Sequence, residues 1–273
     1  MPEVLSEITN EKGTMLLSDV LRGADALDAL NQEDGGGSNN EFTSFKSGSE
    51  YTVKVLGPAD IMAFDSYGIF GKMHSFVAEK PSKKNKNGFP IDELTPWDKA
   101  YRYHKDKSED FSDEHGQEAS KYRVKRRFAM GFYDLDSGEQ IIIDVSKAQG
   151  QAIYSTIKKY EKRLGKLAFE LSKTGSGTST TVSLSPVIDM EEDLTDKQRE
   201  NFEKAPEEFD KTKFDGILFE RDEKAQIEAL HEVGFDVTKI GFEVPKADDD
   251  NADEAAPIGS GEDGEITDDD LPF

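Results

Sequence analysis

Apolar and polar residues alternate along several stretches in the middle of the chain, and this period of two predicts β-strands. The predicted strands are residues 51–56, 67–77, 122–133, 140–145, 167–171 and 180–184. The turn sequence Asp134-Leu135-Asp136-Ser137-Gly138 joins the third strand to the fourth, and a Gly-Ser-Gly turn joins the last two. The central part of the chain is therefore predicted to be mainly β, with two hairpins.

Between these hairpins the period changes to that of a helix. Ser146 and Gln149 have the spacing of a capping box, which predicts that a helix begins here. Its apolar face consists of Ile153, Ile157, Tyr160 and Leu164, and Gly165 follows. The predicted element order is therefore two strands, a hairpin, a helix and a second hairpin. This is the order of an OB-fold-like barrel of five to six strands with one helix at its end.

The remainder of the chain divides into flanking segments of different character. Residues 15–31 form a predicted amphipathic helix, and the glycine-rich residues 33–40 a linker. Residues 80–120 form a long polar insertion into the barrel. We therefore expect a helix and linker at 1–41, a barrel at 42–187, an acidic helical extension at 188–243 and a disordered acidic tail at 244–273.

The formal net charge of −23 is unevenly distributed along the chain. Residues 1–40 carry −6, residues 41–187 carry +3 and residues 188–273 carry −20. A mildly basic middle with acidic flanks is compatible with a polyanionic ligand and with nucleic-acid binding.

Several functional classes find no support in the sequence. Cysteine is absent, which removes disulfides and thiolate chemistry, and no apolar run approaches the ~20 residues that span a bilayer. No Walker-type loop, nucleophile elbow or HExxH motif occurs, and Asp134 and Asp136 are better explained as turn formers than as a magnesium pair. We expect a cytoplasmic protein that is not an enzyme, with no cofactor, metal or membrane contact.

One face of the predicted strand over residues 121–133 gathers positive charge. The other face is apolar apart from Arg126. The charged face presents four cations and then an aromatic ring: Lys121, Arg123, Lys125, Arg127 and Tyr133. Like charges repel unless an anion lies across them, which favours a phosphate ligand. The alternative is a solvated face whose cations pair with carboxylates of a neighbouring strand.

The predicted strand over residues 67–77 carries rings among polar groups on the side opposite Ile69. This side consists of Phe70, Lys72, His74 and Phe76. Exposed rings stack on bases of any sequence for about 1–3 kcal/mol each, while cations follow the phosphates. The alternative is that the phenyl side packs under the helix. We interpret His74 as a hydrogen-bonding or phosphate contact rather than a metal ligand.

The insertion adds a second group of rings and cations, which includes Trp97, Tyr101, Arg102 and Tyr103. Because barrels of this kind bind oligonucleotides with strand faces and long loops, this loop is predicted to close over the bound strand. The alternative is that Trp97 anchors the insertion to the core.

The chain ends in an acidic tail with an apolar tip. Residues 244–273 hold 11 acids and one Lys. The last six residues are Asp268, Asp269, Asp270, Leu271, Pro272 and Phe273. The terminal ring can fill a pocket while its carboxylate meets a cation, and the aspartates steer the tip towards a basic rim. We therefore predict a partner-binding tip; the alternative is a chance terminus.

The ending DDDLPF resembles the C-terminal tip of bacterial and bacteriophage single-stranded-DNA-binding proteins. Residues 45–48, 55–57 and 169–177, together with Pro186, are similar to the phage-type branch of that family. The resemblance covers roughly residues 42–187 and the last six. It implies an OB-fold that coats single-stranded DNA without sequence preference during replication, recombination and repair. It also implies that the tip recruits polymerase, primase-helicase, nuclease and recombination proteins.

Two features of that phage-type branch are not found in this sequence. The cysteines of the structural zinc site are absent, and no basic N-terminal motif for cooperative binding is visible, so self-association along DNA stays open. The rival hypothesis is an acidic adaptor or DNA mimic that binds a replication or host protein and never contacts DNA.

Overall fold

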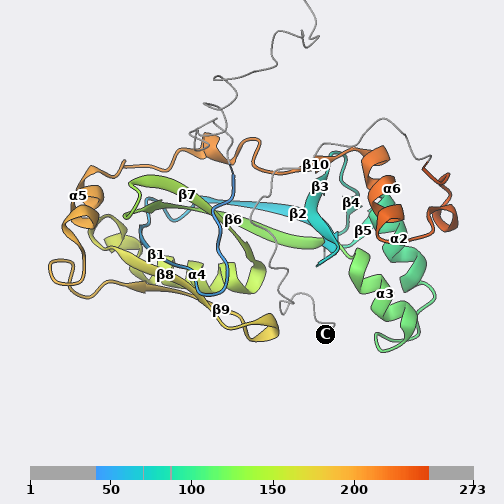
Figure 1. Ribbon diagram of the computed structural model, residues 1–273, viewed down its shortest axis with the longest axis horizontal. Coiled ribbons are helices and arrows are strands. Elements are labelled where there is room, and N and C mark those ends of the chain that lie inside the picture. The colour runs from blue at the N-terminus through green and yellow to red at the C-terminus, as the bar shows by residue number, and fades with distance from the viewer. Residues whose placement is uncertain (1–40, 70, 87, 246–273) are drawn as a thin grey trace, which may run out of the picture. The chain divides into compact units, whose positions relative to one another are not determined.

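The computed structural model describes residues 41–245, apart from Phe70 and Asn87 (Figure 1). The predicted helix over residues 15–31, its linker and residues 246–273 of the acidic tail, with its tip, lie outside the described residues. Among the described residues no helix is both long and apolar enough to cross a membrane.

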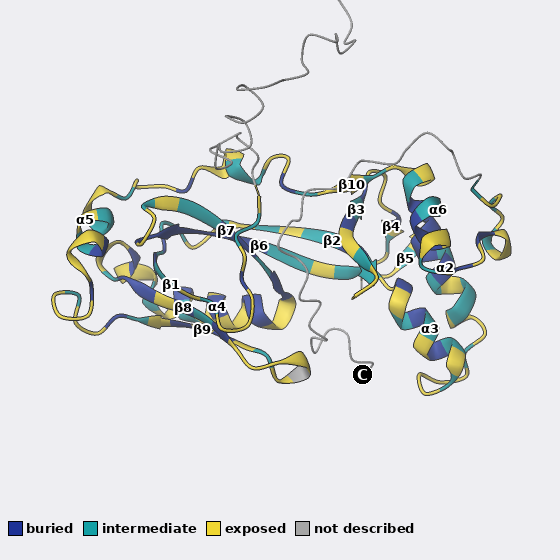
Figure 2. Cartoon of the chain, viewed as in Figure 1, coloured by how far each residue is buried: buried dark blue, intermediate teal, exposed yellow. Residues whose placement is uncertain are grey.

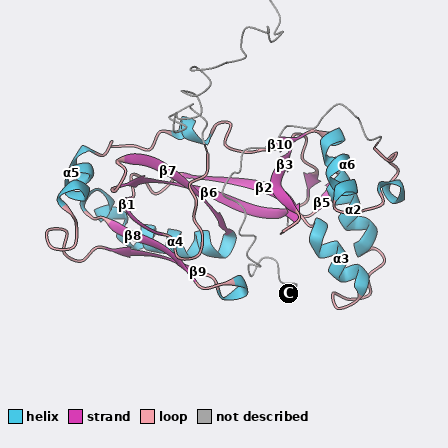
Figure 3. Ribbon diagram, in the orientation of Figure 1, coloured by secondary structure: helices cyan, strands magenta, loops and turns pink. Residues whose placement is uncertain are grey.

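The main sheet has eight strands in the order β10-β3-β2-β6-β1-β8-β9, with β7 on the free edge of β6. The strands are β1 (Glu50–Lys54), β2 (Ile61–Ile69), β3 (Met73–Ala78), β6 (Lys125–Asp134), β7 (Glu139–Ser146), β8 (Phe169–Thr174), β9 (Thr181–Pro186) and β10 (Glu220–Arg221). The fold is mixed α/β rather than mainly β as the sequence predicts, since about 28% of the described residues are in strands and 34% in helices. Helices in the insertion and in the C-terminal part account for the difference (Figure 3).

Strands β1 and β2 pair with the same edge of β6. Val53 of β1 lies opposite Asp134, and Ile61 of β2 lies opposite Met130. The two short strands therefore act as one long strand, interrupted where residues 55–60 leave the sheet and return. Among the described residues no backbone pairing joins β7 to β9, so the predicted barrel is not closed.

The helix α4 (Lys147–Tyr160) begins as the sequence predicts. Ser146 caps it, and the reciprocal hydrogen bonds with Gln149 complete the capping box. Its buried face packs against β6, β7, β8 and β9 in one apolar core, here called the α4 core, which includes Ile153 and Phe169. The helix ends earlier than predicted and continues as the 3-10 helix η2 (Glu161–Lys166).

The predicted single strand over residues 67–77 is wrong, because these residues belong to the end of β2, a turn at Gly71 and Lys72, and β3. Gly71 has a positive φ of 66° at this turn, a conformation that favours glycine. Tyr67 and Phe76 lie opposite each other across the resulting hairpin, so both side chains point to the same side of the sheet. The alternation in the sequence is continuous across the turn and hides it.

The insertion builds a second apolar core instead of a polar loop. It contains the small hairpin β4 (Lys83–Lys84) and β5 (Pro90–Asp92), and the helices α2 (Pro96–Lys105) and α3 (Glu114–Tyr122). Together with α6 (Glu223–Glu232) these helices bury Trp97, Tyr122 and Leu230 in what we call the insertion core. The insertion core and the α4 core lie at opposite ends of β2 and β6 (Figure 1).

The acidic extension over residues 188–243 contains helices, as the sequence predicts. The helix α5 (Asp196–Lys204) has a capping box between Thr195 and Gln198, and Asp222 caps α6. The short 3-10 helices η3 (Gly177–Ser179), η4 (Lys211–Phe214) and η5 (Val237–Ile240) complete the described elements. Phe209 and Ile217, between α5 and α6, are buried against the sheet, so this region packs on the rest of the fold.

Candidate nucleic-acid interface

The row of four cations predicted on one strand face is wrong. The strand β6 begins only at Lys125, so Lys121 lies in α3, where it pairs with Glu118. Arg123 is exposed in the short link between α3 and β6. Arg127 donates to Asp144 of β7 at 3.0 Å, which is the pairing with a neighbouring strand that the alternative interpretation describes.

Three of the rings predicted to stack on bases are buried instead. Phe76 is 1% exposed and Trp97 is 0% exposed, and their ring centroids lie 5.3 Å apart in the insertion core. The Trp97 indole donates to the Gln226 carbonyl at 3.2 Å, so Trp97 anchors the insertion to α6. Tyr133 is 7% exposed beneath the segment that follows β9. These rings therefore form cores, and the predictions that place them in an open groove are wrong.

The other predicted residues are distributed over separate surfaces. Lys72 and His74 are exposed on the β2–β3 hairpin, whereas Tyr101 and Tyr103 are half-buried in the insertion core. Arg102 is exposed and donates to the Pro90 carbonyl at 3.1 Å. Lys125 is half-buried, and Phe70 and the six residues of the tip lie outside the described residues. The structure thus does not bring the predicted site together as one surface.

The face of β6 that carries Arg127 is largely covered by the chain itself. Phe209 and Ile217, from the segment between α5 and β10, pack on Ala129 and Ile142 of this face. A Cβ atom built on Gly131 would lie 2.5 Å from the Phe209 ring, so the glycine is what allows the ring to approach. We call residues 205–219 the C-terminal arm.

The opposite face of β2 and β6 is open between the two cores. Because Asp65 pairs with Arg126 and Ala63 with Phe128, these side chains share one face. Ala63 and Arg126 are exposed, and Ile61 is 37% exposed at the edge of this surface. Figure 2 shows exposed and half-buried segments of β2 and β6 between the buried parts at either end. We call these five residues the Arg126 face.

A charge cluster with two cations and one carboxylate lies on the Arg126 face. Arg126 donates from Nε to Oδ1 of Asp65 at 2.6 Å and from Nη2 to Oδ2 at 3.0 Å. Lys84 of β4 donates to the same carboxylate. Burial of Asp65 raises its pKa, but the hydrogen bonds and charges of Arg126 and Lys84 prevail, so the pKa lies below its ordinary value. The cluster therefore keeps one net positive charge.

Aromatic groups are carried by β6 itself and by two elements that adjoin this cluster, α4 and the loop between β4 and β5. Phe128 is half-buried where α4 crosses β6, since a Cβ on Gly150 would lie 3.9 Å from the Phe128 Cβ. Tyr154, one turn further along α4, is 43% exposed. Phe89, in the loop between β4 and β5, is 50% exposed, and β4 supplies Lys84 to the cluster. Exposed rings beside a net positive charge are the combination that binds unpaired nucleotides.

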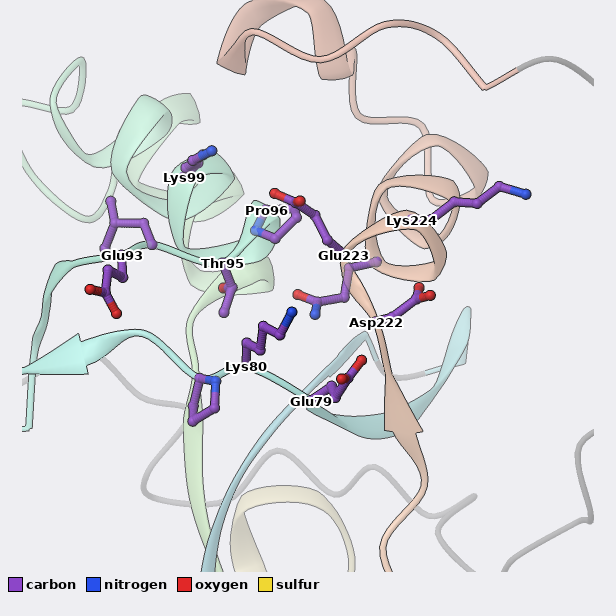
Figure 4. A pocket seen from close by; sticks show the side chains of 12 residues that line it. Glu79, Lys80, Glu93, Thr95, Pro96, Lys99, Asp222, Glu223 and Lys224 are labelled. Carbon is purple, nitrogen blue, oxygen red and sulfur yellow. The ribbon is translucent and has the colours of Figure 1, made fainter.

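A cavity of about 660 Å³ lies between the first turns of α2 and α6 (Figure 4). Three lysines and four carboxylates line it: Lys80, Lys99, Lys224, Glu79, Glu93, Asp222 and Glu223. Since carboxylates outnumber lysines, the cavity does not favour a polyanion. In the described part of the chain no group of three or more metal-ligating side chains comes together.

Neither protein-family models nor curated proteins give a match for this chain. The site therefore rests on its own geometry. Sequence reasoning missed Asp65 and Phe128 as site residues, although Arg126 already stands out as the one charged residue on an otherwise apolar strand face. A charge at that position indicates a strand that leaves the core, and this is where β6 passes from the α4 core to the insertion core.

Proposed function

We propose that this protein binds single-stranded DNA without sequence preference. The observation that carries the proposal is the strand connectivity, in which a long interrupted strand (β1 and β2) pairs with β6, β6 with β7, and β1 with β8, with α4 between β7 and β8. This is the order of an OB-fold, a partly open five-stranded barrel that binds oligonucleotides on a strand face and its loops.

The Arg126 face supplies the two interactions that an unpaired strand needs. Arg126 has a side chain that is 49% exposed and a second guanidinium nitrogen that the Asp65 contact leaves available for a phosphate. Phe128 and Tyr154 offer ring faces beside it for stacking on bases. Stacking and phosphate contact do not read base edges, so binding is expected to be independent of sequence.

The acidic tail gives the proposed protein a second role, in recruitment. Residues 244–273 carry a net charge of −10 and are tethered to the DNA-binding part of the chain. In the proposal the tail competes with DNA for cationic surface and becomes available to replication, recombination and repair proteins when DNA displaces it. The resemblance of the tip to the single-stranded-DNA-binding family supports this part.

The direct test is the fluorescence anisotropy of labelled oligo-dT titrated with the protein at low salt. Saturable binding that weakens as salt rises supports the proposal, because phosphate contacts release counterions. Arg126→Gln is expected to weaken binding several-fold, whereas Lys224→Gln, at an exposed lysine of α6, leaves it unchanged. A wild-type protein that gives no anisotropy change at low salt would exclude DNA binding.

A second candidate function is that of an acidic adaptor or DNA mimic. One observation favours it: residues 188–243 are structured and acidic, and they pack in the insertion core and against the sheet at Ala129 and Ile142. A mimic needs negative charge held in fixed positions, and α5 and α6 provide such positions. The two functions separate in a competition experiment, since a mimic binds a DNA-binding partner in the absence of DNA and fails to bind oligo-dT.

A further inference from the structure

A dense cluster of positive charge lies outside the Arg126 face, where α4 passes into η2. Its five cations are exposed: Lys158, Lys159, Lys162, Arg163 and Lys166. Glu161 is the single acid among them. Within the described part of the chain none of the five forms an ion pair. We call these residues the α4 basic cluster.

The structure of the helix alone does not account for so many cations. Positive side chains near the C-terminus of a helix interact favourably with its dipole, but this effect is confined to the last turn. The α4 basic cluster extends past that turn through the whole of η2, and only Leu164 of η2 is buried. Five like charges held together repel each other, which a polyanion across them would relieve.

An exposed stripe of α4 connects this cluster with the Arg126 face. Gln151, Tyr154, Lys158 and Lys162 follow one another at intervals of three or four residues and are all exposed. The turn of α4 where the stripe begins lies near Phe128, because a Cβ built on the buried Gly150, next to Gln151, would lie 3.9 Å from the Phe128 Cβ. Along α4, Tyr154 therefore falls between the turn nearest Phe128 and the α4 basic cluster.

We infer that the α4 basic cluster is a second phosphate-contact surface for the same polynucleotide, which runs from the Arg126 face along the exposed stripe of α4. Residues 158–166 extend over about 12–16 Å at helical rise. That length accommodates about four phosphates at the spacing of one B-DNA strand, and fewer when the strand is extended. Tyr154 stacks on a base at the midpoint. The inference rests on the proposed function and extends its site.

Continuity with the Arg126 face favours DNA over an acidic peptide as the ligand. The chain's own tail carries one aromatic ring, Phe273, at its very end, so it can place a ring on Tyr154 only with its tip, whereas every nucleotide carries a base. A polynucleotide uses both the ring and the positive charges, since bases stack on Tyr154 while phosphates follow the lysines. The salt dependence of DNA affinity distinguishes the two ligands, because the number of phosphate contacts sets it. Removing lysines of the cluster lowers this dependence if they contact DNA and leaves it unchanged if they bind only a peptide.

The test compares two triple variants that each remove three exposed lysines. Lys158→Gln/Lys162→Gln/Lys166→Gln removes part of the α4 basic cluster. Lys197→Gln/Lys204→Gln/Lys224→Gln removes the same charge from α5 and α6. Each phosphate contact with a single strand contributes about 0.7 to the slope of log affinity against log salt. The first variant is expected to reduce the slope for a long oligo-dT by about 2, and the control to leave it unchanged.

Tyr154 gives a second and independent readout. Tyr154→Ala is expected to weaken oligo-dT binding by roughly 5- to 150-fold, the equivalent of one lost stacking contact, whereas Tyr154→Phe keeps the affinity. Circular dichroism melting of every variant shows whether the fold is retained, which is expected because all the substituted side chains are exposed.

The possible results separate this inference from the proposed function. Wild-type protein that does not bind oligo-dT overturns both. Wild-type protein that binds, with an unchanged slope in the cluster variant or an equal loss in the control variant, overturns the inference and leaves the function standing. Loss of binding to a synthetic 246–273 peptide with an unchanged DNA slope would show that the α4 basic cluster is a peptide site, which also overturns the inference.

Discussion

Substituting Gly131 by alanine tests how the C-terminal arm is held on the sheet. Gly131 lies within β6, and a Cβ atom there would be 2.5 Å from Cζ and 2.6 Å from Cε2 of Phe209. These distances are shorter than real carbon contacts, and Phe209 is only 5% exposed, so its ring has little room to move. Gly131→Ala therefore either strains the buried ring or displaces it from the sheet.

The expected magnitude follows from two opposing effects. Forcing an additional methyl group into a packed core costs about 1–3 kcal/mol. Replacing glycine within a strand gains roughly 0.5–1 kcal/mol from the lower entropy of the unfolded chain. We therefore expect Gly131→Ala to lower the free energy of unfolding by about 1–2 kcal/mol. Phe209→Ala, which removes the ring, is expected to cost about 3–5 kcal/mol.

Urea unfolding followed by far-ultraviolet circular dichroism measures both effects, and the double variant completes a thermodynamic cycle. With the ring gone, the alanine at position 131 has no partner to strain, so the double variant should be more stable than the sum of the single variants predicts, by at least about 1 kcal/mol. Gly165→Ala is the control, because a Cβ there would meet nothing within 4 Å. Additive single effects would refute the contact between arm and sheet.

Three further predictions concern the helix start, the histidine pair and the tail. Ser146→Ala removes the N-cap of α4 and is expected to lower the free energy of unfolding, measured in urea, by about 1 kcal/mol. Ser155→Ala, at an exposed site of the same helix, is the control and should stay within about 0.5 kcal/mol of wild type. Burial and the adjacent His115 ring, 3.0 Å away between Nδ1 atoms, lower the pKa of His104. The folded state therefore binds fewer protons than the unfolded state, so the free energy of unfolding should fall as the pH decreases through about 6.5. Urea midpoints measured from pH 8 to pH 5 follow this change, and His104→Phe should make them depend less on pH. Deleting residues 244–273 is expected to tighten oligo-dT binding at low salt and to abolish partner recruitment, and an unchanged low-salt affinity would contradict competition by the tail.

The sequence predicted those elements that depend on residues close to one another in the chain. The capping box at Ser146 and the hairpin turn at Asp134 are short-range features, and both are present in the structure. They depend on hydrogen bonds between near neighbours, so the sequence is sufficient to find them.

Long-range packing decided the features that the sequence did not reveal. Trp97 and Phe76 look like available rings in the sequence, but α6, more than a hundred residues later, covers them. The charge on Arg127 looks unpaired until β7 brings Asp144 beside it. The Arg126 face depends on the register between β2 and β6, which no local pattern specifies.

The salt-dependent binding of labelled oligo-dT to wild-type protein and to Arg126→Gln tests the central claim most directly. The account predicts saturable binding whose affinity falls as salt rises, and a several-fold weaker affinity for Arg126→Gln. Trp97 fluorescence should stay nearly constant during the titration, because Trp97 is 0% exposed. Failure of the wild-type protein to bind, or equal affinity of the variant across the salt series, would contradict the account.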